Sequence, residues 1–173
     1  MNMKKLRILV IEDSKIHQES ARATLEGHIV VIAETFHDGM SWIVNGYSSA
    51  KREQEGKTTF DVVLTDMMLP VDLGSLSMAD RRKFPEGTLA PYGFSLALRA
   101  AQEGIPFVAM VSQGNHHADP VCHSLDYLGG PSYQGHPPIL NVNGGRVIFT
   151  HAPTTKNGAK DWGMILRDLI GDQ

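Results

Sequence analysis

Three carboxylate side chains follow short, largely apolar runs of the sequence. Glu12 and Asp13 come directly after residues 6–11, and Asp66 follows residues 62–64 after a single threonine. Both runs are rich in β-branched residues, which favours buried strands of a parallel sheet over helices. Ligands of open α/β sheets gather beyond the carboxyl ends of the strands. We therefore expect the three acids at one edge of a sheet; the alternative for Asp66 is a helix cap or a turn residue.

The three acids are suited to a divalent cation. Neighbouring carboxylates repel one another and resist joint ionisation unless a cation neutralises them. Mg²⁺ takes oxygen ligands from one or two carboxylates and keeps several of its waters. The sequence therefore predicts a Mg²⁺ site at Glu12, Asp13 and Asp66. Asp13 and Asp66 are expected to bind the ion directly, and Glu12 is expected to act partly through water.

Two further motifs make this pattern more specific. Pro70 stands four residues after Asp66, and a later apolar run, residues 107–111, ends at Ser112. In their order and spacing the motifs resemble the receiver domain of two-component response regulators. The resemblance covers residues 6–74, 92–114 and 146–170.

The resemblance implies a role for each of these residues. Asp66 would accept a phosphoryl group from a histidine kinase or a histidine phosphotransfer protein. Glu12 and Asp13 would hold Mg²⁺ together with the backbone carbonyl of Met68. The hydroxyl of Ser112 would sense the bound phosphate.

The sequence departs from this family at the end of the last predicted strand. Receivers carry a lysine there, usually followed directly by proline, which reaches the phosphoryl oxygens. Residues 147–150 instead lead to His151, with Pro153 one residue later than expected and Lys156 in the following loop. We expect His151 to replace the lysine, with Lys156 as the alternative, because a strand end fixes direction better than a loop. An imidazole there predicts phosphate binding that strengthens from about pH 8 to about pH 6.

Two stretches have no counterpart in a minimal receiver. Residues 75–91 separate Gly74 from the helical pattern that begins at Gly93, and they include three consecutive basic residues. A loop of this length beside a site is more often functional or mobile than neutral. A partner contact, a lid and a solubilising surface all stay open for it. Residues 129–145 begin with the glycine- and proline-rich composition of a loop.

Composition and charge exclude several classes of protein. The net charge of −3, from 16 basic and 19 acidic residues, provides no basic surface for nucleic acid and no polybasic membrane anchor. Cys122 is the only cysteine, so an internal disulfide is excluded. The first apolar run is too short for a signal peptide or a membrane span. These features predict a cytoplasmic protein.

The predicted fold is α/β: a flavodoxin-like, five-stranded parallel sheet with helices on both faces. The length of 173 residues and the hydrophobic content of 42% predict a single domain, residues 1–173, with insertions at about 75–91 and 129–145. The clearest helix is the last, because apolar residues recur in it at helical spacing before Gly171. The helix predicted after Ser14 has only a thin apolar face. The strands are expected at residues 6–11, 29–33, 62–66, 105–111 and 146–150 or 151.

The predicted function is that of a stand-alone receiver. It would be phosphorylated on Asp66 in a Mg²⁺-dependent phosphorelay and would switch its binding to an unknown downstream protein. The alternative is a degenerate receiver that acts only as a docking module, and the residue at the lysine position discriminates the two. A Mg²⁺-dependent hydrolase is disfavoured, because Met68 stands where a second acid would serve as general acid. We expect no enzymatic activity beyond the protein's own phosphoryl transfer and autodephosphorylation.

Overall fold

The computed structural model describes residues 5–45, 60–114, 120–127 and 138–171. In these residues the larger of two sheets has six strands in the order β2-β1-β3-β6-β8-β7. The first five strands in this order are mutually parallel, and β7 joins the edge antiparallel to β8. The flavodoxin-like fold is thus confirmed, with one edge strand more than predicted. The strands are β1 (Arg7–Ile11), β2 (Ile29–Ala33), β3 (Val62–Asp66), β6 (Phe107–Ser112), β7 (Ile139–Val142) and β8 (Gly145–His151).

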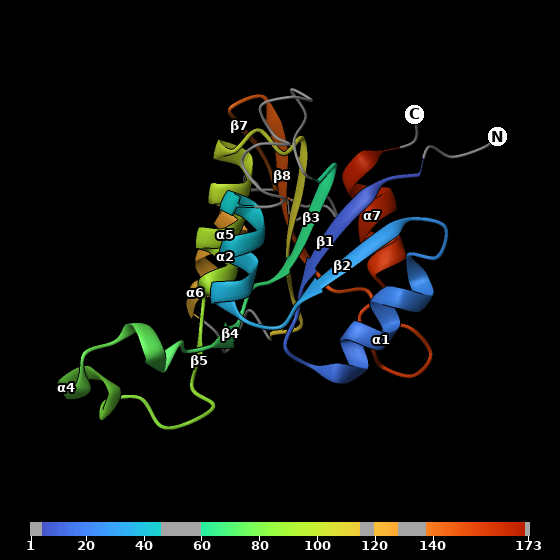
Figure 1. The fold of residues 1–173 in the computed structure, drawn as a ribbon. Coiled ribbons are helices and arrows are strands. Elements are labelled where there is room, and N and C mark those ends of the chain that lie inside the picture. The colour runs from blue at the N-terminus through green and yellow to red at the C-terminus, as the bar shows by residue number, and fades with distance from the viewer. Residues whose placement is uncertain (1–4, 46–59, 115–119, 128–137, 172–173) are drawn as a thin grey trace.

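Helices cover both faces of the sheet (Figure 1). One face carries α2 (Phe36–Asn45), α5 (Tyr92–Gln102) and α6 (Pro120–Asp126), and the other carries α1 (Lys15–Thr24) and α7 (Trp162–Ile170). The last helix begins with the Asp161 carboxylate accepting a bond from the Met164 N–H (2.9 Å) and ends at Gly171, as the sequence predicts. Within the described parts of the chain, every helix is too short or too polar to cross a membrane.

The two faces of the sheet have separate hydrophobic cores. Leu9 and Ile11 of β1 pack in the core beside α2 and α5, whereas Ile8 and Val10 pack in the core beside α1 and α7. Successive side chains of a strand point to opposite faces, so a strand covered on both sides must be apolar throughout. Burial on both faces explains the continuous apolar runs that precede the acids.

The additional strand β7 lies in the second predicted insertion. Ile139–Val142 pairs with β8 through the two-residue turn Asn143-Gly144, whose φ angles are 48° and 81°. Positive φ at both positions is the requirement of a type I′ hairpin turn, and Asn-Gly is its strongest sequence signal. That signal was present in the sequence, but β7 was not among the five predicted strands. Residues 129–137 of the insertion lie outside the described residues.

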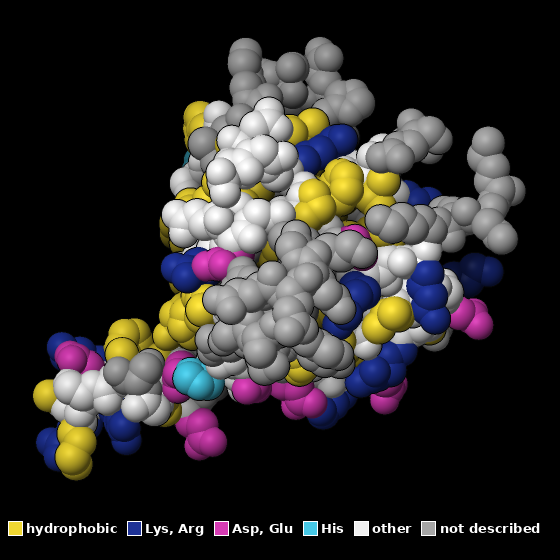
Figure 2. All heavy atoms as spheres, turned by 45° about the horizontal axis from the view of Figure 1, so that its top comes forward, with side chains coloured by type: hydrophobic (Ala, Val, Ile, Leu, Met, Phe, Trp, Pro, Cys, Tyr) yellow, Lys and Arg dark blue, Asp and Glu magenta, His cyan; other side chains and the backbone are white. Residues whose placement is uncertain are grey.

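A narrow arm, residues 69–90, contains most of the first predicted insertion and projects from the body (Figure 1). Its base is a small antiparallel sheet of β4 (Leu69–Pro70) and β5 (Leu89–Ala90), and it also contains the 3₁₀ turn η1 (Leu73–Ser75) and the short helix α4 (Met78–Arg81). Figure 2 shows hydrophobic, basic and acidic side chains interspersed over the arm.

Candidate functional site

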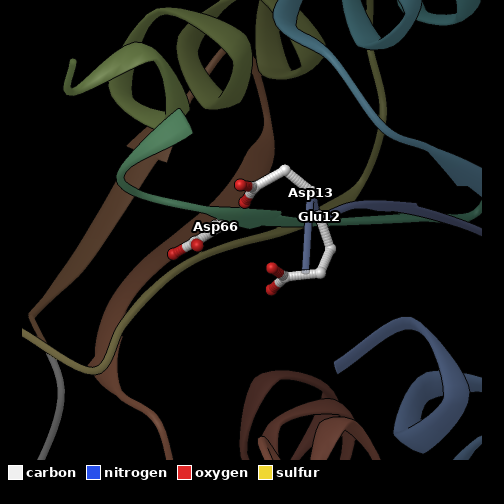
Figure 3. A group of neighbouring side chains, drawn as sticks. All are labelled: Glu12, Asp13 and Asp66. Atoms are coloured by element: carbon white, nitrogen blue, oxygen red, sulfur yellow. The ribbon is translucent and has the colours of Figure 1, made fainter. Parts of the chain in front are cut away.

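The three predicted acids lie together at the ends of two neighbouring strands. Glu12 and Asp13 follow β1, Asp66 ends β3, and the two strands are parallel with Ile11 beside Thr65. One carboxylate oxygen from each acid lies within 4.8 Å of the others, close enough to hold a metal ion together. Figure 3 shows the three carboxylates gathered beyond the strand ends. The sheet register therefore creates the acidic cluster that the sequence predicts.

A buried lysine contacts this cluster. The ammonium nitrogen of Lys160 lies 2.5 Å from Glu12 Oε2 and 2.8 Å from Asp66 Oδ2, and its side chain is 2% exposed. Lysine is almost never buried this fully unless it is paired. The resemblance to receivers implies a lysine in this role beside the acids, and Lys160 supplies an ammonium group there.

Neither residue predicted for that role contacts the site in the structure. His151 ends β8 beside Ser112 and is exposed, and β8 is separated from β3 by the intervening strand β6. Lys156 is also exposed, in the loop that follows. The expectation that His151 replaces the lysine is therefore corrected to Lys160, and the pH dependence predicted for an imidazole there loses its basis.

The loop between β8 and α7 explains the error. It folds back as a narrow hairpin, closed by a bridge between Thr154 and Lys160 and by a hydrogen bond from Thr155 N–H to the Ala159 carbonyl (2.8 Å). Gly158 turns its tip with φ 77°. The hairpin returns Lys160 to the sheet edge nine residues after the strand end. One sequence signal could have identified Lys160. It stands directly before Asp161, which caps the clearly predicted last helix.

Burial sets the electrostatics of the cluster. The pKa of Glu12 is raised from 4.5 to about 7, because burial and the nearby Asp66 together outweigh the lowering effect of Lys160. Burial also raises the pKa of Asp66, opposed by Lys160 and by a hydrogen bond from the Met68 N–H. When ionised, three carboxylates and one ammonium leave two negative charges uncompensated. That excess matches the charge of one divalent cation.

The hydrogen bonds of Glu12 distinguish it from the other two acids. Its Oε1 accepts from the Ser14 N–H (3.0 Å) and its Oε2 contacts Lys160, so both oxygens already have protein partners. This arrangement agrees with direct binding of a cation by Asp13 and Asp66 and with an outer role for Glu12. The role of the Met68 carbonyl stays a prediction.

Ser112 lies on β6, the strand next to β3, which ends in Asp66. Val111 of β6 is the register partner of Asp66, so Ser112 stands one residue beyond it at the same edge. The serine is 2% exposed, and its hydroxyl oxygen accepts from the Gly114 N–H (2.9 Å). Its role as a phosphate sensor stays a prediction.

The arm is anchored beside Asp66 at both ends. It leaves the body three residues after Asp66, and where it returns the Gly93 N–H donates to the Met67 carbonyl (3.0 Å). A Cβ atom on Gly93 would lie 2.1 Å from the Asp66 carbonyl oxygen, closer than atoms can approach. Glycine is therefore required where α5 meets the end of β3.

No family model matches the sequence, and no curated protein matches it. Among solved structures, the chain is similar to a response regulator receiver protein from Sinorhizobium medicae WSM419, with a TM-score of 0.50 and 13% identity over 97% of this chain and 94% of that one. It is similar to the bacteriophytochrome response regulator AtBRR, with a TM-score of 0.51 and 17% identity over 98% and 96% of the two chains. The Mn(2+)-bound form of response regulator Rcp1 gives a TM-score of 0.51 and 14% identity over 97% of both chains. At these identities the similarity concerns the fold, and the chain has the receiver-domain fold of response regulators.

Proposed function

We propose that the protein is a stand-alone response-regulator receiver that accepts a phosphoryl group on Asp66 in a Mg²⁺-dependent phosphorelay. The observation that carries the proposal is the buried Lys160, whose ammonium lies 2.8 Å from Asp66 Oδ2 beside two further acids. Glu12 and Lys160 are fully buried and Asp13 and Asp66 are partly buried beside them, and burying charged groups costs desolvation free energy of several kcal/mol per ion. A module that only docks has no need of this arrangement, whereas phosphoryl transfer uses every part of it.

The transfer needs a nucleophile and compensation of charge. A carboxylate oxygen of Asp66 attacks phosphorus, the phosphorus–nitrogen bond of the donor phosphohistidine breaks, and its electron pair leaves with the imidazole. The product is an acyl phosphate on Asp66. Lys160 is positioned to pair with the phosphoryl oxygens, because its ammonium already contacts this carboxylate. A Mg²⁺ ion held by Asp13, Asp66 and the Met68 carbonyl, with Glu12 acting through water, would neutralise charge on the transferring group.

The modification would also act as a switch. A phosphoryl group adds a charge of about −2, which new hydrogen bonds and ion pairs must compensate. Ser112 and Lys160 are the groups placed to respond, since both lie at the same sheet edge as Asp66. The partners are a histidine kinase or histidine phosphotransfer protein and an unidentified downstream protein, with neither nucleic acid nor membrane involved, in the cytoplasm. Beyond its own phosphoryl transfer and autodephosphorylation, the protein is not an enzyme.

Incubation with acetyl phosphate and Mg²⁺, followed by intact mass measurement, tests the proposal. The parent should gain the mass of one phosphoryl group, and Asp66→Asn should gain nothing. Asp72→Asn, which changes a carboxylate of the arm, is the matched control and should label as the parent does. An adduct that survives Asp66→Asn, or that maps to Asp61 or Asp72, would contradict the assignment. An unlabelled parent would favour the phosphorylation-independent docking module.

The metal part of the proposal has its own measurement. Calorimetric titration with Mg²⁺ should give strong binding to the parent and much weaker binding to Asp13→Asn and Asp66→Asn, because each removes a direct ligand. Unchanged binding in both variants would place the ion elsewhere.

A further inference from the structure

One face of α1 holds the segment in which Lys160 lies. The Lys160 N–H donates to His17 Nδ1 (3.2 Å), and Ser20 Oγ donates to the Lys160 carbonyl (2.7 Å). Three residues further on, the Gly163 N–H donates to Thr24 Oγ1 (3.2 Å). Positions 17, 20 and 24 lie on one face of a helix, because they are separated by three and by seven residues. Both main-chain polar groups of Lys160 are therefore satisfied by side chains of α1.

The contacts of His17 define its protonation state. Because Nδ1 accepts a hydrogen bond, it carries no proton, and the neutral ring must carry its proton on Nε2. Burial and the charge of Lys160 lower the pKa of His17, while Asp66, Asp13 and a hydrogen bond with the Gln113 side chain oppose this shift. The neutral ring is thus favoured, and its Nε2–H is the donor available to Gln113.

Gln113 connects the same ring to the phosphate-sensing strand. It directly follows Ser112, and its side-chain amide also donates to the Gly158 carbonyl (3.4 Å) in the hairpin that carries Lys160. His17 therefore contacts both the residue after Ser112 and the backbone of Lys160. Such a link matters here because Lys160 lies in a loop, without the restraint that a strand end provides.

We propose that His17 is a positioning residue for phosphoryl transfer. His17 holds the main chain of Lys160 so that the Lys160 ammonium contacts Asp66, and it links Lys160 to Gln113, the residue after Ser112. The proposal rests on the proposed function of Asp66. His17 itself does not touch the reacting atoms. Its loss should lower the rate of transfer and leave Mg²⁺ binding unchanged, because its hydrogen bond is to Lys160 and not to a proposed Mg²⁺ ligand.

Three variants test this role. His17→Leu removes the acceptor, whereas His17→Asn can place an amide oxygen near the position of Nδ1. With acetyl phosphate at saturating Mg²⁺, His17→Leu should be phosphorylated about tenfold more slowly, as expected for one lost hydrogen bond of about 1.4 kcal/mol. His17→Asn should recover most of that loss, and Mg²⁺ affinity should stay within about twofold of the parent in both. His28→Leu is the matched control, because His28 Nδ1 accepts from the Leu6 N–H at the same 3.2 Å near the other end of β1.

The outcomes separate this inference from the proposed function. If the parent is phosphorylated and His17→Leu labels at the parent's rate, or if His17→Asn is as slow as His17→Leu, the positioning role is wrong and the function of Asp66 stands. If the parent is not phosphorylated, the proposed function fails and the role in transfer fails with it. The ¹⁵N spectrum of the imidazole gives a test that needs neither phosphorylation nor a folded variant. A neutral His17 ring with its proton on Nε2 is expected at neutral pH, and a proton on Nδ1 would overturn the inference.

Discussion

The raised pKa of Glu12 predicts an unusual pH dependence of stability for the metal-free protein. An ordinary glutamate releases its proton near pH 4.5, but burial holds the Glu12 proton to about pH 7. Between these values the native state binds more protons than the unfolded chain, so the free energy of unfolding must fall as pH rises. The Glu12 carboxyl group therefore lowers the free energy of unfolding most at neutral pH, because its charged form is then buried.

The size of the effect follows from the two pKa values. At 1.36 kcal/mol per pH unit, the two protonation curves give a loss of about 2 kcal/mol between about pH 5 and about pH 7. Glu12→Gln removes the titration, so its free energy of unfolding should lack this decrease, whatever constant offset comes from the altered contact with Lys160. The difference between parent and variant isolates Glu12, because His17 and the other groups titrate in both proteins.

Urea unfolding of the metal-free proteins at several pH values measures this difference. Glu34→Gln is the control, since Glu34 is an exposed partner of Lys15 and its removal should leave the slope unchanged. Saturating Mg²⁺ should reduce the parent's decrease, because a nearby cation favours the ionised carboxylate. Parallel stability profiles for the parent and Glu12→Gln would refute the reasoning, since Glu12 would then titrate alike in the native and unfolded states.

Two further substitutions test the packing that positions the site. Gly93→Ala should lower the free energy of unfolding by about 3 kcal/mol, because the added methyl group would overpack against the Asp66 carbonyl. Its control is Ser95→Ala, at an exposed position of the same helix, which should change the free energy of unfolding by less than about 0.5 kcal/mol. Similar values for the two variants would contradict the close approach. Leu64→Ala should cost about 3 kcal/mol, because Leu64 is fully buried in the central strand β3, and a cost below about 1 kcal/mol would show that the core relaxes around the missing side chain. Met78→Ala, in the arm with Met78 76% exposed, is its control and should fall within about 0.5 kcal/mol. Chemical denaturation of each variant supplies the measurement.

The parts of the site that depend on strands could be predicted from the sequence. Runs of β-branched residues locate strands, and parallel strands align their carboxyl ends. The sequence alone therefore places Glu12, Asp13 and Asp66 at one edge of the sheet. Ser112 followed from the same rule. These predictions hold because the side-chain direction at a strand end is fixed by the sheet.

The parts that depend on loops could not be predicted in the same way. The path of the hairpin before Lys160 depends on its contacts with α1, and the two segments are more than a hundred residues apart in the sequence. The thin apolar face of α1 was the indirect sign, because His17 and Ser20 use positions of that helix for polar contacts. The strand β7, unlike the hairpin before Lys160, has a local sequence signal, because Asn143-Gly144 is typical of a hairpin turn.

The arm also divides the molecule into two complementary pieces. Its outer part contains Arg81, Arg82 and Lys83 and is joined to the body only through two short strands, so among the described residues trypsin should cut there first. The amino-terminal piece would then contain the acidic cluster, and the carboxyl-terminal piece would contain Lys160 and Ser112. Pairing of β3 with β6 runs through the middle of the sheet and joins the two pieces. The protein is thus a natural candidate for fragment complementation, in which neither fragment has a complete site and reassociation restores it.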